Sequence, residues 1–209
     1  MPAERLHLVR HGEVHNPSRV LYGRLPDFRL SADGRRMTRQ AAEYVHGLER
    51  PVTGLVCSPL QRTQESAEPF TELFGLDPVI DPDVIEPWNV FEGKQMRRAL
   101  MNPLNWRHLV RPAQPSWGEP YRDVVARMQA AMGRLWDAVP AGDVVIVSHQ
   151  LPIWITHLAI AGAPLKHDPR TRRCALSSVT SFEGGPGAWR EVAYAEPAAS
   201  AGAIDVGAV

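Results

Sequence analysis

The sequence contains only two cysteines, Cys57 and Cys174, among its 209 residues. Two cysteines are too few for a disulfide framework, and each is expected to be a small buried apolar residue. The chain also lacks any apolar run of about eighteen residues, and its N-terminus lacks the long apolar segment of a signal peptide. We therefore expect a cytoplasmic protein without a membrane-spanning helix.

Net charge is absent as well, because 23 Lys and Arg residues balance 23 Asp and Glu residues. Without a global electrostatic field, binding to nucleic acid or to an anionic membrane is not expected, and any positive site must be local. The length and the hydrophobic content of 44% suit one domain over residues 1–195. The tail at 196–209 is rich in Ala and Gly and is expected to be disordered.

Strand and helix patterns alternate along the chain. Strands are predicted at 5–10, 53–58 and 143–149, helices at 30–49, 59–75, 119–139 and 151–162, and a late hairpin at 175–183 and 188–195. Ser31 is expected to cap the first helix, and Pro59 to lie in the first turn of the second. The alternation predicts an α/β fold of three layers, α/β/α, with a mostly parallel central sheet.

Polar residues follow three of the predicted strands. Arg10 and His11 end the first, Ser58 ends the second, and His149 ends the third long one. Because ligands of open α/β sheets bind at the carboxyl ends of the strands, these residues are expected to share one site. Helix N-termini at 59–62 and 150–153 would add backbone N–H donors at the same edge.

The residue types at this edge suit phosphoryl chemistry. A neutral imidazole such as that of His11 is a good nucleophile toward phosphorus. Guanidinium groups such as those of Arg10 and Arg62 donate paired hydrogen bonds to phosphate and stay charged. With that many donors, no metal and no other cofactor is required.

Two other interpretations of the same segments are weaker. His7, His11 and His15 are spaced like zinc ligands on a helix, but residues 5–10 are predicted to be a strand, where this spacing separates the side chains. Cys57 lies near the predicted site, but Arg62 comes one residue too early for the Cys-x5-Arg loop of thiol phosphatases.

Four segments in order resemble the signatures of the histidine phosphatase superfamily, the phosphoglycerate-mutase-like enzymes, and favour its phosphatase branch. They are LVRHGEVHN (8–16), YGRLPDFRLSADG (22–34), CSPLQRTQESA (57–67) and VVIVSHQ (144–150). The resemblance implies the phosphoglycerate-mutase-like α/β/α fold, with a small lid-like helical insertion at about 86–118. It is carried by several spaced motifs and not by Arg-His-Gly alone.

The resemblance also implies roles for single residues. His11 would be the phosphorylated nucleophile, with Arg10, Arg62 and His149 forming the phosphate pocket. The proton donor would be Glu86, in the segment IEPWNVFEG (85–93), with Glu13 and Glu92 as alternatives. Four further residues are assigned to substrate binding: Asn16, Tyr22, Gly23 and Gln150.

Together these features predict a metal-independent phosphomonoesterase that acts on a small phosphorylated molecule through phosphohistidine. A phosphoglycerate mutase-type transfer is the second hypothesis, and a non-catalytic phospho-ligand binding protein is the third. The sequence is compatible with a homodimer. Residues 94–116 carry five basic residues and no acidic one, which suits either a lid that selects anionic substrates or a solvated helix pair.

Overall fold

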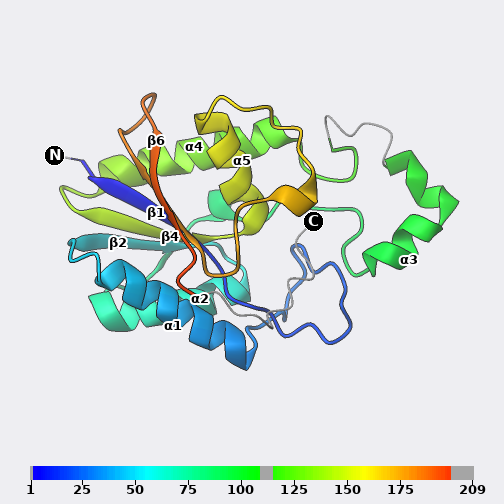
Figure 1. The fold of residues 1–209 in the computed structure, drawn as a ribbon, viewed down its shortest axis with the longest axis horizontal. Coiled ribbons are helices and arrows are strands. Elements are labelled where there is room, and N and C mark those ends of the chain that lie inside the picture. The colour runs from blue at the N-terminus through cyan, green and yellow to red at the C-terminus, as the bar shows by residue number, and fades with distance from the viewer. Residues whose placement is uncertain (1, 109–114, 199–209) are drawn as a thin grey trace.

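The computed structural model of the chain describes residues 2–108 and 115–198. Its sheet has the strand order β3-β2-β4-β1-β5-β6 (Figure 1). The strands are β1 Arg5–Arg10, β2 Val52–Cys57, β3 Val79–Ile80, β4 Asp143–Ser148, β5 Val179–Glu183 and β6 Arg190–Ala195. The first four of these run parallel to one another, whereas β5 is antiparallel to β1 and β6 is antiparallel to β5. The predicted mostly parallel α/β sheet is confirmed.

Helices cover both faces of the sheet, as Figure 1 shows. They are α1 Ala32–His46 and α2 Gln61–Phe74 on one face, and α4 Tyr121–Ala138 and α5 Gln150–Ile160 on the other. Strand residues alternate between the two layers: Ile146 packs toward α4 and α5, and Val147 toward α1 and α2. Because all six residues of β4 are buried, this strand lies at the centre of the core, where each large apolar side chain contributes about 1.5–3 kcal/mol.

The start of α1 is as predicted, and the start of α2 is not. Ser31 caps α1 by accepting a hydrogen bond from the Gly34 N–H. Helix α2 begins only at Gln61, so the expectation that Pro59 lies in its first turn is wrong. Leu60 is the N-cap and has an extended backbone, so residues 58–60 form the connection out of β2. The Thr63 hydroxyl lies 2.6 Å from the Leu60 carbonyl and 2.8 Å from the Ser58 carbonyl of this connection.

The late hairpin is confirmed, with a shorter first strand than expected. Ser177 adopts a left-handed φ of 56°, so the predicted strand at 175–183 begins only at Val179. The Ser177 N–H donates to the His11 carbonyl at 3.2 Å, which explains the turn. Of the tail expected to be disordered, residues 199–209 lie outside the described part, and Ala198 packs in a small cluster with Met37 and Leu176.

The insertion between β3 and α4 contains η1 (Pro82–Val84), α3 (Met96–Met101) and η2 (Pro103–His108). In Figure 1, α3 stands away from the three layers. A small cluster of Leu21, Phe91 and Ala99 anchors it, while Leu104 and Trp106 remain exposed. Among the described residues, no helix has the length and apolar character needed to cross a membrane.

Candidate active site

Strand register brings the predicted residues to one edge of the sheet. Arg10 is paired with Ser148, and Cys57 with Val147, so β1, β2 and β4 end at the same level. The backbone continues this alignment by one residue, because the His11 N–H donates to the Ser148 carbonyl at 3.1 Å. His11, Ser58 and His149 therefore leave three neighbouring strands side by side.

His11 is buried, and its tautomer is fixed by the next residue. Its Nδ1 lies 2.7 Å from the Gly12 carbonyl oxygen, which can only accept a hydrogen bond. Nδ1 therefore carries the proton, and Nε2 carries the lone pair. Burial and the nearby charges of Arg62 and Arg10 lower the pKa of His11 well below its usual range. The ring is consequently neutral and nucleophilic at neutral pH.

Gly12 allows the loop after β1 to pack closely against α1. A Cβ atom at this position would lie 2.4 Å from the Gly34 carbonyl oxygen, so no larger residue fits without backbone movement. The loop that follows is closed at its base by a bridge between Val14 and Leu30 and by a 2.9 Å hydrogen bond from the Ser31 N–H to the Glu13 carbonyl. The nucleophile is thus fixed independently of the outer part of this loop.

Arg62 projects from the first turn of α2 and is 1% exposed. Its Nη2 donates to the Gly23 carbonyl at 2.8 Å and to His149 Nδ1 at 3.1 Å. Its guanidinium lies 4.8 Å from the centre of the Tyr22 ring. Burial lowers the pKa of Arg62, but a guanidinium remains charged at neutral pH. Its buried Nε has no hydrogen-bond partner among the described residues, which leaves a donor available to an anion.

His149 is the N-cap of α5 and is fully buried. Because Arg62 can only donate, His149 Nδ1 accepts, and Nε2 carries the proton 2.8 Å from the Ser58 hydroxyl oxygen. Burial, followed by the charge of Arg62, lowers the pKa of His149 well below its usual range. The two histidine rings lie 5.3 Å apart, both neutral in the free protein.

Glu86 brings a carboxyl group close to His149. It lies two residues after η1, and its Oε2 is 3.7 Å from His149 Nδ1. Burial raises the pKa of Glu86, while Arg62 and then Arg172 oppose the rise. The two alternative carboxylates are engaged elsewhere: Glu13 accepts from the Ser31 hydroxyl at 2.6 Å, and Glu92 accepts from the Arg24 N–H at 3.0 Å.

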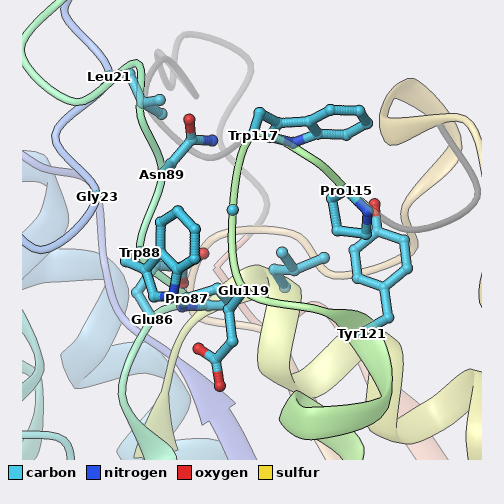
Figure 2. Close-up of a pocket in the computed structure, with 12 residues that line it drawn as sticks. Leu21, Gly23, Glu86, Pro87, Trp88, Asn89, Pro115, Trp117, Glu119 and Tyr121 are labelled. Atoms are coloured by element: carbon cyan, nitrogen blue, oxygen red, sulfur yellow. The ribbon is translucent and has the colours of Figure 1, made fainter. Parts of the chain in front are cut away.

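A small pocket opens beside Glu86 (Figure 2). In that view Leu21, Trp88 and Glu86 lie on one side, and Trp117 and Tyr121 on the other. Arg24 and Arg127, which lie close by, are both paired with Glu119. The pocket therefore combines aromatic walls with charges that are already neutralised, next to the carboxyl group of Glu86.

The remaining predicted residues surround the same edge. Arg10 is fully buried, and its Nη1 donates to the Cys174 carbonyl at 2.7 Å. Tyr22 lies 6.3 Å from the His11 ring, between ring centres, and Gln150 opens α5. Asn16 uses both ends of its amide on the Val20 backbone, at 2.8 and 3.2 Å, so its contact with substrate stays a prediction.

Sequence reasoning missed one partly buried cation near the site, Arg172. It lies in the loop between α5 and β5, with no motif around it and no regular spacing from the other residues. Only the tertiary structure brings it to Gln150 and Tyr121. The predicted insertion at 86–118 contributes Glu86, Trp88 and Trp117 to the pocket, whereas the basic residue Arg111 lies outside the described part.

Comparisons with known proteins agree with this geometry. Residues 6–197 match the family model of the histidine phosphatase superfamily, branch 1. The chain is 46% identical over 204 residues to the uncharacterised protein Rv0525 of Mycobacterium tuberculosis, covering 95% of this chain and 100% of that one. It is 28% identical to the probable phosphoglycerate mutase GpmB of Cronobacter sakazakii, covering 84% of both chains.

A solved structure gives the same picture. The mycobacterial glucosyl-3-phosphoglycerate phosphatase Rv2419c, in its complex with inorganic phosphate, superposes with a TM-score of 0.71 at 25% identity. The alignment covers 94% of this chain and all of that one. The relatives thus include both a phosphatase and a probable mutase.

Proposed function

Because this chain belongs to the histidine phosphatase superfamily, we propose that it is a metal-independent phosphomonoesterase that forms a phosphohistidine on His11. The observation that carries the proposal is the convergence of a neutral, buried imidazole with two buried guanidinium groups, Arg10 and Arg62, at one sheet edge. A small phosphorylated molecule is the proposed substrate. No cofactor is part of the proposal.

His11 supplies the nucleophile. Its Nε2 lone pair attacks phosphorus in line as the ester P–O bond breaks, and the ring gains positive charge. The Gly12 carbonyl, 2.7 Å from Nδ1, accepts the hydrogen bond that this charge strengthens. Because the pKa of free His11 is low, little of the enzyme is lost to the protonated form at neutral pH.

Arg10, Arg62 and His149 form a phosphate cradle. This cradle holds the equatorial oxygens of the transferring phosphoryl group. Arg10 and Arg62 supply two positive charges against a group that carries about two negative ones. His149 is neutral before substrate binds, and the approaching anion favours its protonated form. The N-terminus of α5, which starts at Gln150, adds favourable backbone dipoles.

Glu86 serves first as acid and then as base. Its raised pKa keeps a proton available for the departing alkoxide oxygen. The resulting carboxylate then removes a proton from the water that attacks phosphohistidine. Breaking the P–N bond releases inorganic phosphate and restores neutral His11.

The mutase relative supports a second candidate, transfer of phosphate within a phosphorylated sugar acid. The alignment with GpmB covers 84% of both chains, so chain length does not separate the two reactions. Hydrolysis is the first choice because the solved structure that this chain matches over its whole length, Rv2419c, is a phosphatase. Incubation with 3-phosphoglycerate separates the two, because a phosphatase releases inorganic phosphate and a mutase yields the 2-phospho isomer.

The test of the proposal is direct trapping of the intermediate. Wild-type protein, quenched in base during turnover of p-nitrophenyl phosphate, should carry an acid-labile phosphoryl group on His11. Peptide mapping by mass spectrometry locates it. A phosphoryl group on any other residue, or turnover without any phosphoenzyme under rapid quench, would refute the mechanism.

A further inference from the structure

Arg172 is held next to the active site by neutral acceptors. Its Nε donates to His167 Nε2 at 2.9 Å, and its Nη1 donates to the Gln150 side-chain oxygen at 3.2 Å. His167 Nδ1 lies 2.8 Å from the Leu165 carbonyl oxygen, so the ring is protonated there and offers Nε2 as an acceptor. The guanidinium is therefore oriented without being neutralised.

No carboxylate in the described part of the chain forms an ion pair with Arg172. This separates it from its neighbours, because Arg127 is paired with Glu119 and Arg173 with Glu191. Burial lowers the pKa of Arg172, but the group stays charged at neutral pH. Arg172 is partly buried, and a cation withdrawn from water without a counter-charge loses solvation that a bound anion would replace.

Arg172 is linked both to the phosphate-binding arginine Arg10 and to Glu86. A chain of contacts joins it to the phosphate cradle, because Gln150 and Arg10 both donate to the Cys174 carbonyl. After Arg62, Arg172 is the strongest of the charges that oppose the raised pKa of Glu86.

Tyr121 connects Arg172 with the pocket. Burial raises the pKa of Tyr121, and the charge of Arg172 and a hydrogen bond with it oppose this rise. Tyr121 lines the pocket together with Glu86 (Figure 2). The group that Glu86 would protonate is the ester oxygen, so the alcohol part of a substrate would enter the pocket that Glu86 shares with Tyr121, the hydrogen-bond partner of Arg172.

We infer that Arg172 binds a second anionic group, a carboxylate or a second phosphate, on the alcohol part of the substrate. The inference rests on the proposed function. Arg10 and Arg62 already match the transferring phosphoryl group, so a neutral alcohol would leave Arg172 uncompensated. His167 and Gln150 are positioning residues, since they orient the guanidinium without contacting the substrate.

The test compares two ligands that differ at one group: 3-phosphoglycerate has a carboxylate where glycerol 3-phosphate has a hydroxymethyl group. Calorimetric titration into the inactive His11→Asn variant should show at least about tenfold tighter binding of 3-phosphoglycerate. Adding Arg172→Gln should reduce this ratio to near one, and Arg172→Lys should restore part of it. Arg173→Gln, which removes the adjacent surface charge, should leave the ratio unchanged.

A third ligand, 1,3-propanediol bisphosphate, distinguishes the two sources of negative charge. Tighter binding of the acid identifies the substrates as phosphorylated carboxylic acids, and tighter binding of the bisphosphate identifies them as bisphosphates. An unchanged ratio after Arg172→Gln, or no preference in the parent variant, overturns the inference.

These outcomes are separable from failure of the proposed function. Because affinity is measured without turnover, an Arg172-dependent ratio with no phosphate release by the wild type would leave the inference standing and the hydrolase proposal wrong. Conversely, His11-dependent hydrolysis of p-nitrophenyl phosphate with a ratio indifferent to Arg172 would overturn the inference alone.

Discussion

The two ends of the parallel strands differ in how their positively charged side chains are paired. At the amino end, His7 lies between Ser181 and Asp143, at 2.8 and 3.1 Å, and Asp143 is also bonded to Arg50. Each positive group there has a carboxylate beside it. At the carboxyl end, Arg62 and Arg172 have only neutral partners in the described part of the chain. Matched charge indicates a structural network, and unmatched charge indicates a place prepared for a ligand.

The sharpest way to break this comparison is to replace His7, which lies within β1, and His11, which follows it. His11→Asn should lower turnover of p-nitrophenyl phosphate by about 10⁴-fold or more, because it removes the nucleophile, and should leave the free energy of unfolding nearly unchanged. His7→Asn should lower the free energy of unfolding by about 1–3 kcal/mol and keep the activity of the folded fraction. Activity assays and urea titration measure both. The reverse pattern would contradict the distinction between the two ends.

Arg62→Lys probes the geometry of the unmatched end while keeping its charge. The planar guanidinium of Arg62 donates to both Gly23 and His149, and the ammonium group of lysine cannot reproduce this arrangement. We expect a loss of about 3–4 kcal/mol in transition-state stabilisation, measured as a fall in kcat/KM. The control is Arg39→Lys on α1, whose partner is the exposed Glu72. Equal kcat/KM values for both variants would remove Arg62 from the cradle.

Asp143→Ala probes the matched end. Removing a carboxylate shared by His7 and Arg50 should lower the free energy of unfolding by about 3 kcal/mol at neutral pH. Asp33→Ala, which breaks an exposed pair with Arg36, should cost less than about 1 kcal/mol. If the two variants unfold at the same urea concentration, the amino-end network is not structural.

At low pH, Asp143→Ala should no longer lower the free energy of unfolding. Burial acts to raise its pKa, but the hydrogen bonds from His7 and Arg50 outweigh burial and set the pKa below its ordinary value of 3.8. A lowered pKa stabilises the fold fully above the ordinary value and loses that contribution as pH falls through the folded value. The difference between wild type and Asp143→Ala should therefore shrink below about pH 4, as urea titrations across pH would measure.

Glu86→Gln is expected to have the smallest effect, and a selective one. Hydrolysis of an alkyl phosphate should slow by about 10²-fold, while p-nitrophenyl phosphate, whose leaving group needs no proton, should be nearly unaffected. For the wild type, a raised pKa means that alkyl phosphate turnover falls as pH rises through it, and the variant should lose this alkaline limb. Equal losses for both substrates would move the acid role to another carboxylate.

The fold could be predicted from sequence wherever a local pattern is strong. The buried run of β4 and the cap at Ser31 are examples, because burial and capping are read from neighbouring residues. The start of β5 could not, since Ser177 donates to the His11 carbonyl, which only the tertiary structure brings there. The predicted start of α2 is too early because it rests on the general preference of proline for first turns, whereas Leu60 is the residue that precedes the helix.

The candidate site divides in the same way. His11 and Arg62 lie in motifs that sequence reasoning picked out, and the structure brings them together. Glu86 came from resemblance alone, because the segment around it has no periodic pattern. Arg172 could not be found, since its partners His167 and Gln150 gain meaning only when the loop after α5 folds back on the helix start.

The closed base of the loop between β1 and α1 has a consequence for how this enzyme family can diversify. Residues 13–14 and 30–31 form a clasp, so the segment between them can change in length or composition without disturbing the backbone that carries His11. Tyr22 and Gly23, which sit inside this segment, touch Arg62. New substrate preferences can thus arise by exchanging a surface loop, while the reactive group stays in place.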